Sequence, residues 1–304
     1  FIGSTGFGNA NYIYMAIRKP HKPASEFTAT QLFSVNAGVN SGGAGQPGFV
    51  TGFPVDMGIF RIPGSTSDYD IMTRLTGVRR LDFTTGTEAN KGNDAKMDYM
   101  NGWGYNANSY RGWAWRRASG YFDVVCYTGS GGSTNTFNHN LGVVPEMMWV
   151  KRRDSSDSWW IYHKDMTGTP HNAYLILTTD AAVVTGNDAG YGNVAPTATQ
   201  FTVGGFPASS GGTFVAYLFA TAAGISKLGS YTGTGSNVNV DCGFSAGARF
   251  VLIKRSDSTG DWYLYDSVRG IVAGDDPYLL LNSTAAQVTN TDYIDPLNAG
   301  FTVT

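Results

Sequence analysis

Two short stretches, about a hundred residues apart, place carboxylates next to adjacent aromatic rings, a combination that can bind sugars. They read RDSSDSWWIY (153–162) and RSDSTGDWYLY (255–265). Flat rings can cover the apolar faces of a sugar, and nearby carboxylates can orient its hydroxyl groups. Because successive residues of a strand point to opposite faces, only one ring of each adjacent pair can face inward. We assign the identical positions, Trp159 and Trp262, to the core.

The rings next to these tryptophans are then the outward-facing candidates, and with the acidic turn residues they form a candidate glycan-binding site. The competing interpretation is that the rings pack in the core or between modules, since one large aromatic side chain buries ~150–250 Å². We favour packing over glycan binding. The candidate residues are Trp160, Tyr263, Asp154, Asp157, Asp257 and Asp261.

Other chemistry for these carboxylates is less well supported. Calcium is held by several oxygen ligands, but each turn is short and offers two carboxylates beside basic residues. The sequence GDD at 274–276 has a similarly weak claim. A glycan-cleaving enzyme needs two carboxylates about 5–10 Å apart in a cleft, and no acidic pair recurs in such a setting. We therefore interpret the acidic residues as turn residues and expect no metal site.

Signals for catalysis or cofactor binding are also missing from the sequence. The chain has four histidines, and none recurs between the similar stretches. The glycine-rich segments GSGG and GTGS lead into a strand, whereas a phosphate cradle needs the N-terminus of a helix there. We expect no catalytic residue and no cofactor, and a protein that is not an enzyme. The histidines are His21, His139, His163 and His171.

Composition points to an all-β protein with many tight turns. Among 304 residues there are 40 glycines, and aromatic residues make up 13%. The net charge of −2, with 14% charged residues, does not favour nucleic acid as a partner. No apolar run approaches the ~20 residues that span a bilayer, and we see no signal peptide. We expect Cys126 and Cys242 to be free thiols, because they fall at different positions of the repeat described next.

The two acidic and aromatic stretches belong to an internal duplication. At an offset of 103, six residues of the first stretch recur in the second: Lys151, Arg152, Asp154, Ser155, Trp159 and Tyr162 map onto Lys254, Arg255, Asp257, Ser258, Trp262 and Tyr265. The segments YTGSGG (127–132) and YLILTTDAA (174–182) return at an offset of 104 as YTGTGS and YLLLNSTAA. Matching blocks in the same order at nearly one offset indicate tandem modules.

A third, more divergent copy precedes these two. An aromatic strand that closes each module occurs near 12–19, 110–117 and 214–221, with Ala16 aligned on Ala114. We therefore place modules at 20–119, 120–223 and 224–304, the last of which stops before its closing strand, and interpret 1–19 as closing strands.

Two explanations fit this frame. The chain is cut from a longer array, which we favour and which its start at Phe1 also suggests, or its N-terminal strand completes the last module and closes a ring.

Each module reads as an antiparallel β-sandwich. In the middle copy, seven short runs are rich in β-branched and aromatic residues and are bounded by turn residues. The runs Met147–Val150 and Phe250–Ile253 lack alternation, so we expect both to be buried on both faces. The predicted strands are 121–129, 134–141, 146–153, 158–166, 173–179, 200–205 and 213–221.

Several of these motifs together resemble a repeated β-domain of virion proteins from tailed bacteriophages, especially phages of marine bacteria and cyanobacteria. The resemblance covers roughly residues 10–304. The first copy departs from the pattern because it lacks the Lys-Arg pair and the Trp of the hairpin. The motifs are GYFDVVCYTG (120–129), HNLGVVPEMMWVKRR (139–153), WWIYHKDM (159–166), YLILTTDAA (174–182), APTATQFTVG (195–204) and GTFVAYLFA (212–220), with VTGFPVDMGIF (50–60) and MDYMNGW (97–103) in the first copy.

The resemblance implies a non-enzymatic structural component of a virion appendage such as a tail fibre, located on the particle surface. Members often sit beside lectin-like domains, which implies host-surface carbohydrate binding as the alternative function. We expect the chain to assemble as a homo-oligomer, a trimer above all, together with other virion proteins. The alternative function implies host surface polysaccharide as a partner. We expect neither nucleic acid nor a membrane as a partner.

Overall fold

The computed structural model describes residues 23–304, apart from 40–45, 92–95, 105–106 and 167. This part of the chain is all-β and its strands pair antiparallel, as the sequence predicted. The predicted closing strands at 1–19 lie outside the described residues. The helices within the described part are short 3-10 segments: η1 (Ala24–Glu26), η2 (Ala29–Gln31), η3 (Arg74–Thr76), η5 (Pro170–Asn172) and η6 (Phe206–Ala208).

The middle module contains all seven predicted strands and one more, β14. Six of them form a large sheet in the order β14-β13-β12-β11-β16-β9, and two form the small sheet β10-β15. The strands are β9 (Phe122–Thr128), β10 (Thr134–Asn138), β11 (Met147–Arg152), β12 (Trp159–His163), β13 (Ala173–Ile176), β14 (Val184–Thr185), β15 (Gln200–Gly204) and β16 (Thr213–Phe219).

The first module repeats this arrangement despite its divergent sequence. Its large sheet runs β1-β8-β3-β4-β5-β6 and its small sheet is β2-β7, so the closing strand β8 again lies between the first and third strands. The strands are β1 (Phe33–Ala37), β2 (Phe49–Val50), β3 (Met57–Arg61), β4 (Asp70–Thr73), β5 (Arg79–Leu81), β6 (Ala89–Asn90), β7 (Gly102–Trp103) and β8 (Arg111–Trp115).

The third module keeps part of this arrangement. It has two three-stranded sheets, β18-β19-β20 and β17-β22-β21. In β18 and β19, Lys254 lies opposite Trp262, just as Lys151 lies opposite Trp159 in β11 and β12. The strands are β17 (Val238–Asp241), β18 (Phe250–Lys254), β19 (Trp262–Asp266), β20 (Leu279–Leu280), β21 (Ile294–Leu297) and β22 (Gly300–Val303).

Aromatic rings join the two layers within a module. In the middle module Tyr127 stacks on Phe137 with ring centroids 4.0 Å apart, which connects β9 of the large sheet to β10 of the small one. In the first module Phe49 stacks on Trp103 across the small sheet at 4.7 Å, and Phe60 of β3 packs 5.7 Å from Trp103. The small sheet therefore covers one face of the large sheet.

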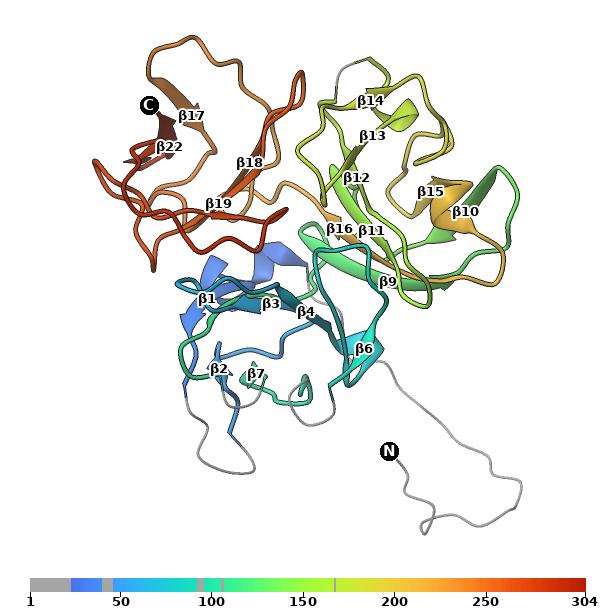
Figure 1. The fold of residues 1–304 in the computed structure, drawn as a ribbon, viewed down its shortest axis with the longest axis horizontal. Helices are drawn as coiled ribbons and strands as arrows, with labels where there is room; N and C mark the ends of the chain where they lie inside the picture. Colours follow the sequence, from blue (N-terminus) through green and yellow to red (C-terminus); the bar gives the residue numbers. More distant parts are fainter. Residues whose placement is uncertain (1–22, 40–45, 92–95, 105–106, 167) are drawn as a thin grey trace.

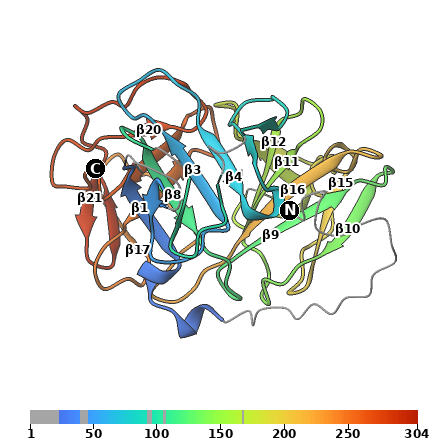
Figure 2. The same cartoon turned by 90° about the horizontal axis from the view of Figure 1, so that it is seen from below.

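The other face of each large sheet turns toward the neighbouring modules. Figures 1 and 2 show the first module (blue to green), the middle module (green to light orange) and the third module (orange to red) grouped around a common centre. One cluster of buried apolar residues runs through all three and contains Trp113, Trp159 and Trp262. The three modules thus share one hydrophobic core.

Burial of the third strand differs between modules. Met147–Val150 is buried along its whole length, which confirms that prediction. The same prediction for Phe250–Ile253 was wrong, because only Val251 is fully buried there and its neighbours are half-buried. β11 is flanked by β12 and β16, whereas β18 is the edge strand of its sheet.

The connections between modules are short turns. Gly120 and Gly224 have φ values of 81° and 70°, a backbone conformation that glycine adopts without strain. Each turn is closed by an isolated bridge, Ala118 with Phe122 and Ala222 with Ser226. Cys126 and Cys242 are free, as predicted.

Candidate functional site

The turn of the repeated hairpin contacts a different module. In the middle module the turn joins β11 to β12, and its backbone pairs with the loop after β5 of the first module. Arg153 O accepts a hydrogen bond from Glu88 N at 2.8 Å, and Asp157 N donates one to Thr85 O at 3.0 Å. We call this pair of backbone hydrogen bonds a joint.

The same joint connects the third module to the middle one. Ser256 O accepts from Val183 N at 2.9 Å, and Gly260 N donates to Asp180 O at 2.8 Å. Ser256 follows Lys254 by two positions, as Arg153 follows Lys151, so the two hairpins use equivalent atoms.

A third joint connects the first module to the third. Pro63 O accepts from Gln287 N at 2.8 Å, and Ser67 N donates to Thr284 O at 3.1 Å. Each module therefore contacts the next through its hairpin turn, and the three joints together form a closed ring.

A cation is placed beside every joint. Arg61, Lys151 and Lys254 occupy equivalent positions, each four residues after the first paired residue of its strand. The Arg61 guanidinium is fully buried and donates to carbonyl oxygens of the third module, at 3.0 Å to Thr284 and 2.9 Å to Ala285. These bonds neutralise no charge, but they give the buried guanidinium hydrogen-bond partners across the joint.

The two lysines make simpler contacts. Lys151 is fully buried and its Nζ donates to Asp157 O of its own hairpin at 2.6 Å. Burial lowers the pKa of Lys151 to about 8. Lys254 Nζ donates across the joint to Asp180 O at 3.1 Å, and burial lowers the pKa of Lys254 as well.

An aromatic ring lies eight residues after each of these cations. Trp159 and Trp262 are buried, which confirms their assignment to the core. In the first module the corresponding residue is Tyr69, whose buried ring lies 4.6 Å from the Arg61 guanidinium carbon. The first copy thus keeps the pairing with Arg and Tyr in place of Lys and Trp. The constant spacing of eight was a signal that the sequence analysis did not use.

The structure corrects the expectation that Trp160 faces outward. Only 7% of Trp160 is exposed, because Phe206 stacks on it at 5.3 Å and Tyr174 packs edge-on at 4.8 Å. Its Nε1 donates to Asp157 Oδ1 at 3.2 Å. The second layer of the same module covers this ring, which is therefore not accessible to a ligand.

Tyr263, the matching residue of the third module, is half-buried in a cluster of tyrosines. Its ring packs 5.1 Å from Tyr278 and 6.1 Å from Tyr293, and these two stack on each other at 5.9 Å. Tyr293 is 45% exposed. This tyrosine cluster is a surface where the flat face of a sugar could pack.

The predicted acidic residues hold their own turns together. Asp154 Oδ1 accepts from Arg152 Nε at 3.0 Å and from Thr213 N at 3.1 Å, and Asp257 Oδ1 accepts from Arg255 Nε at 2.8 Å.

The remaining acidic residues have similar roles. Asp261 Oδ1 accepts from Asn282 Nδ2 at 2.8 Å, and Asp157 Oδ1 accepts from Ser158 N at 2.7 Å. Asp276, in the GDD sequence, accepts from Val272 N at 2.8 Å, and burial raises the pKa of Asp276 to about 6. The described part of the chain contains no group of three or more metal-ligating side chains.

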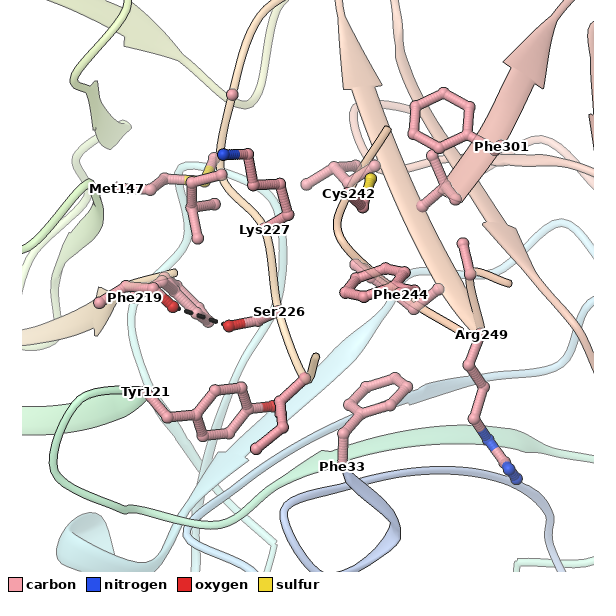
Figure 3. Close-up of a pocket in the computed structure, with 18 of the residues that line it drawn as sticks. Phe33, Tyr121, Met147, Phe219, Ser226, Lys227, Cys242, Phe244, Arg249 and Phe301 are labelled. Carbon is pink, nitrogen blue, oxygen red and sulfur yellow. Dashed lines mark hydrogen bonds between the residues drawn. The ribbon is translucent and has the colours of Figure 1, made fainter. Parts of the chain in front are cut away.

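A cavity of about 530 Å³ lies where the three modules meet. Met147 and Phe219 of the middle module lie on one side, Phe244 and Phe301 of the third module lie on the other, and Phe33 of the first module lies below them (Figure 3). Its wall also includes most of β18 and the segment 226–230 of the third module. The sequence analysis did not find this cavity, because its wall comes from all three modules.

Comparison with known proteins gives one match. The model of a protein family described as a domain of unknown function (DUF7483) matches residues 82–304. No curated protein and no solved structure matches the chain. Within the described residues, no helix has the length and apolar character needed to span a membrane.

Proposed function

The chain belongs to the DUF7483 family of domains of unknown function, and for this member we propose a non-enzymatic structural role as a stiff building block of a bacteriophage virion appendage. The closed ring of three joints carries this proposal. A unit held by the same two backbone hydrogen bonds at every contact, around one shared core, resists bending between its modules.

Two further features support a mechanical role. The turns between modules are only a few residues long, so no flexible linker separates one module from the next. The joints are formed by the repeated hairpin. Its sequence is the most similar part of the middle and third modules. Two residues of the repeated motif, Trp159 and Lys151, are buried there and are not accessible to a substrate.

The virion part of the proposal rests on the resemblance of the repeated motifs to β-domains of tailed-phage particles. In such a particle the chain assembles as a homo-oligomer, for which we expect a trimer, and contacts other virion proteins. Its location is the particle surface.

The decisive experiment is immunogold electron microscopy of purified phage particles whose genome encodes this chain, with mass spectrometry of the same particles. We expect the chain among the virion proteins and gold label on a tail appendage. Particles that lack the chain, or label confined to cell debris in the lysate, would contradict the proposal. Mass measurement of the purified chain in solution tests the expected trimer separately.

One observation favours carbohydrate binding as a second candidate function. The tyrosine cluster Tyr263, Tyr278 and Tyr293 presents stacked rings at the surface. A glycan array probes it with wild type and with Tyr293→Ala, because Tyr293 is the most exposed of the three. Binding that is lost in Tyr293→Ala and kept in Tyr231→Ala, an exposed tyrosine outside the cluster, supports this function. No binding by wild type, or equal loss in both variants, counts against it.

A further inference from the structure

The edge strand β18 stands out when the three large sheets are compared. β11 pairs on one side with β12 and on the other with the closing strand β16, and β3 pairs in the same way with β4 and β8. β18 pairs with β19, and no strand of the described residues pairs with its outer edge. Unpaired backbone groups along an edge are a template for another strand.

The segment Ser226–Thr232 faces the unpaired edge of β18 from the other side of the cavity. It follows the Ala222–Ser226 bridge, as β9 follows the Ala118–Phe122 bridge, so it is the counterpart of β9. In the middle module β16 separates β9 from β11. Between their counterparts in the third module lies the 530 Å³ cavity, which both Ser226–Ser230 and β18 line.

We infer that this cavity is the acceptor groove for a closing β-strand, and that the occupant is the N-terminal segment Tyr12–Arg18 of the same chain. The strand would run antiparallel to β18 and to Ser226–Thr232 and complete the third module. The matching positions come from the sequence: Ala16 aligns with Ala114 of β8, which lies opposite Gly58 of β3.

The alignment fixes a register. Trp115 pairs with Met57 and Phe219 pairs with Met147, and Phe250 is the third-module counterpart of those methionines. Ile17 aligns with Trp115, so it lies opposite Phe250, and Met15 then lies opposite Leu252. Side chains alternate between the faces of a strand, so Ile17 and Met15 share one face and both are apolar.

The neighbouring module offers a specific contact for Met15. At the equivalent position of β16, the Tyr217 hydroxyl lies 2.5 Å from Thr73 Oγ1 of the first module. At the equivalent position of β8, Trp113 Nε1 donates to Asp266 Oδ2 of the third module at 3.2 Å. Thr73 and Asp266 occupy equivalent positions in their modules, and the matching residue of the middle module is His163, which lines the cavity. Burial lowers the pKa of His163.

Chain connectivity favours the chain's own segment. β8 leads into β9, with seven positions from Trp115 to Phe122, and β16 leads into Ser226–Thr232, with seven positions from Phe219 to Ser226. The next module in the ring after the third is the first, whose first strand begins at Phe33. Sixteen positions separate Ile17 from Phe33, which is more than the other two connections need.

Disulfide trapping in the full chain tests the register. In a background with Cys126→Ser and Cys242→Ser, we pair Met15→Cys with Leu252→Cys, and as a control Ser4→Cys with Leu252→Cys. Opposite residues of an antiparallel pair have Cα atoms about 4.5–5.5 Å apart, within disulfide reach. We expect an intrachain disulfide at least about tenfold more abundant for the first pair, because pairing concentrates the two thiols. Equal yields, or disulfides formed between two chains, overturn the inference.

Hydrogen exchange in chains with native cysteines is the second test and does not depend on that background. Met15→Pro removes a backbone donor within the proposed strand, whereas Asn9→Pro lies outside it. We expect amides of Phe250–Lys254 to exchange at least about tenfold faster in Met15→Pro than in wild type, with Asn9→Pro unchanged. Exchange that is the same in all three chains overturns the inference.

Discussion

The middle and third modules share the most similar sequence, yet their matching strands sit in different environments. β11 is buried along Met147–Lys151, whereas β18 is half-buried and forms a sheet edge. Trp160 is covered by Phe206, whereas Tyr263 lies in a cluster that reaches the surface. The two hairpins thus pair alike and make equivalent joints, while the burial of each hairpin depends on strands and loops elsewhere in the chain.

The largest expected loss of stability comes from the buried tryptophan that the two hairpins have in common. Trp159→Ala and Trp262→Ala should each lower the free energy of unfolding by about 3–5 kcal/mol, because both rings are buried in the shared core. Denaturant unfolding followed by circular dichroism measures this. A loss under about 1 kcal/mol at either position would show that the shared core does not include that ring.

Matched Trp→Phe variants at these two positions sharpen the comparison. Trp159 Nε1 donates to Asp82 O at 2.8 Å, whereas the buried Nε1 of Trp262 has no hydrogen-bond partner among the described residues. Trp159→Phe should therefore cost about 1 kcal/mol more than Trp262→Phe. Equal costs in the same unfolding measurement would contradict the contribution of that hydrogen bond.

The next largest effect is a difference in stability loss between variants of the two joints in which the third module takes part. Arg61→Met removes the hydrogen bonds that the buried guanidinium donates to the carbonyl groups of residues 283–285 and should cost about 2–3 kcal/mol. Lys254→Met removes one bond across a joint, from a half-exposed side chain, and should cost under about 1 kcal/mol. The reverse order in thermal unfolding would show that the joint between the first and third modules contributes less than its contacts suggest.

A smaller effect is a pH dependence at Lys151. Its pKa is about 8 in the folded chain and near 10.5 in the unfolded chain, so the unfolded state binds more protons between these values. The cost of burying the charge is fully present below pH 8 and is relieved as the pH rises toward 10.5. From pH 8 to 10, the unfolding free energy of wild type should therefore rise by about 1–2 kcal/mol relative to Lys151→Met. Parallel pH profiles for the two chains would contradict this.

The smallest effect separates the two acidic turns. Asp154 bonds both Arg152 and the backbone of Thr213, so Asp154→Ala should cost about 0.5 kcal/mol. Asp257 bonds Arg255 alone, and both side chains are largely exposed, so Asp257→Ala should leave the melting temperature unchanged. A glycan ligand at the Asp257 turn would instead appear as a loss of binding in that variant.

Sequence reasoning was reliable where the relevant contacts are local. All seven strands predicted in the middle module formed, and Trp159 and Trp262 are in the core. It failed for Trp160, because the covering ring of Phe206 is far along the chain, and it missed Arg61 and Tyr69, because Arg and Tyr replace Lys and Trp there. Alternation predicts which way a side chain points but not what a second layer places over it.

The amino-acid sequence by itself determined the strands of the middle module, the module repeat and the burial of Trp159 and Trp262. These features depend on residue type and on spacing within a few tens of residues. Only the tertiary structure decided that the hairpin turns dock on neighbouring modules, that three modules close into a ring, and that a groove runs beside β18. Those outcomes depend on backbone groups that meet across long stretches of the chain, from Glu88 to Arg153 in one joint and from Pro63 to Gln287 in another. Nearly every residue carries the same backbone donor and acceptor, so residue types do not predict which of them pair.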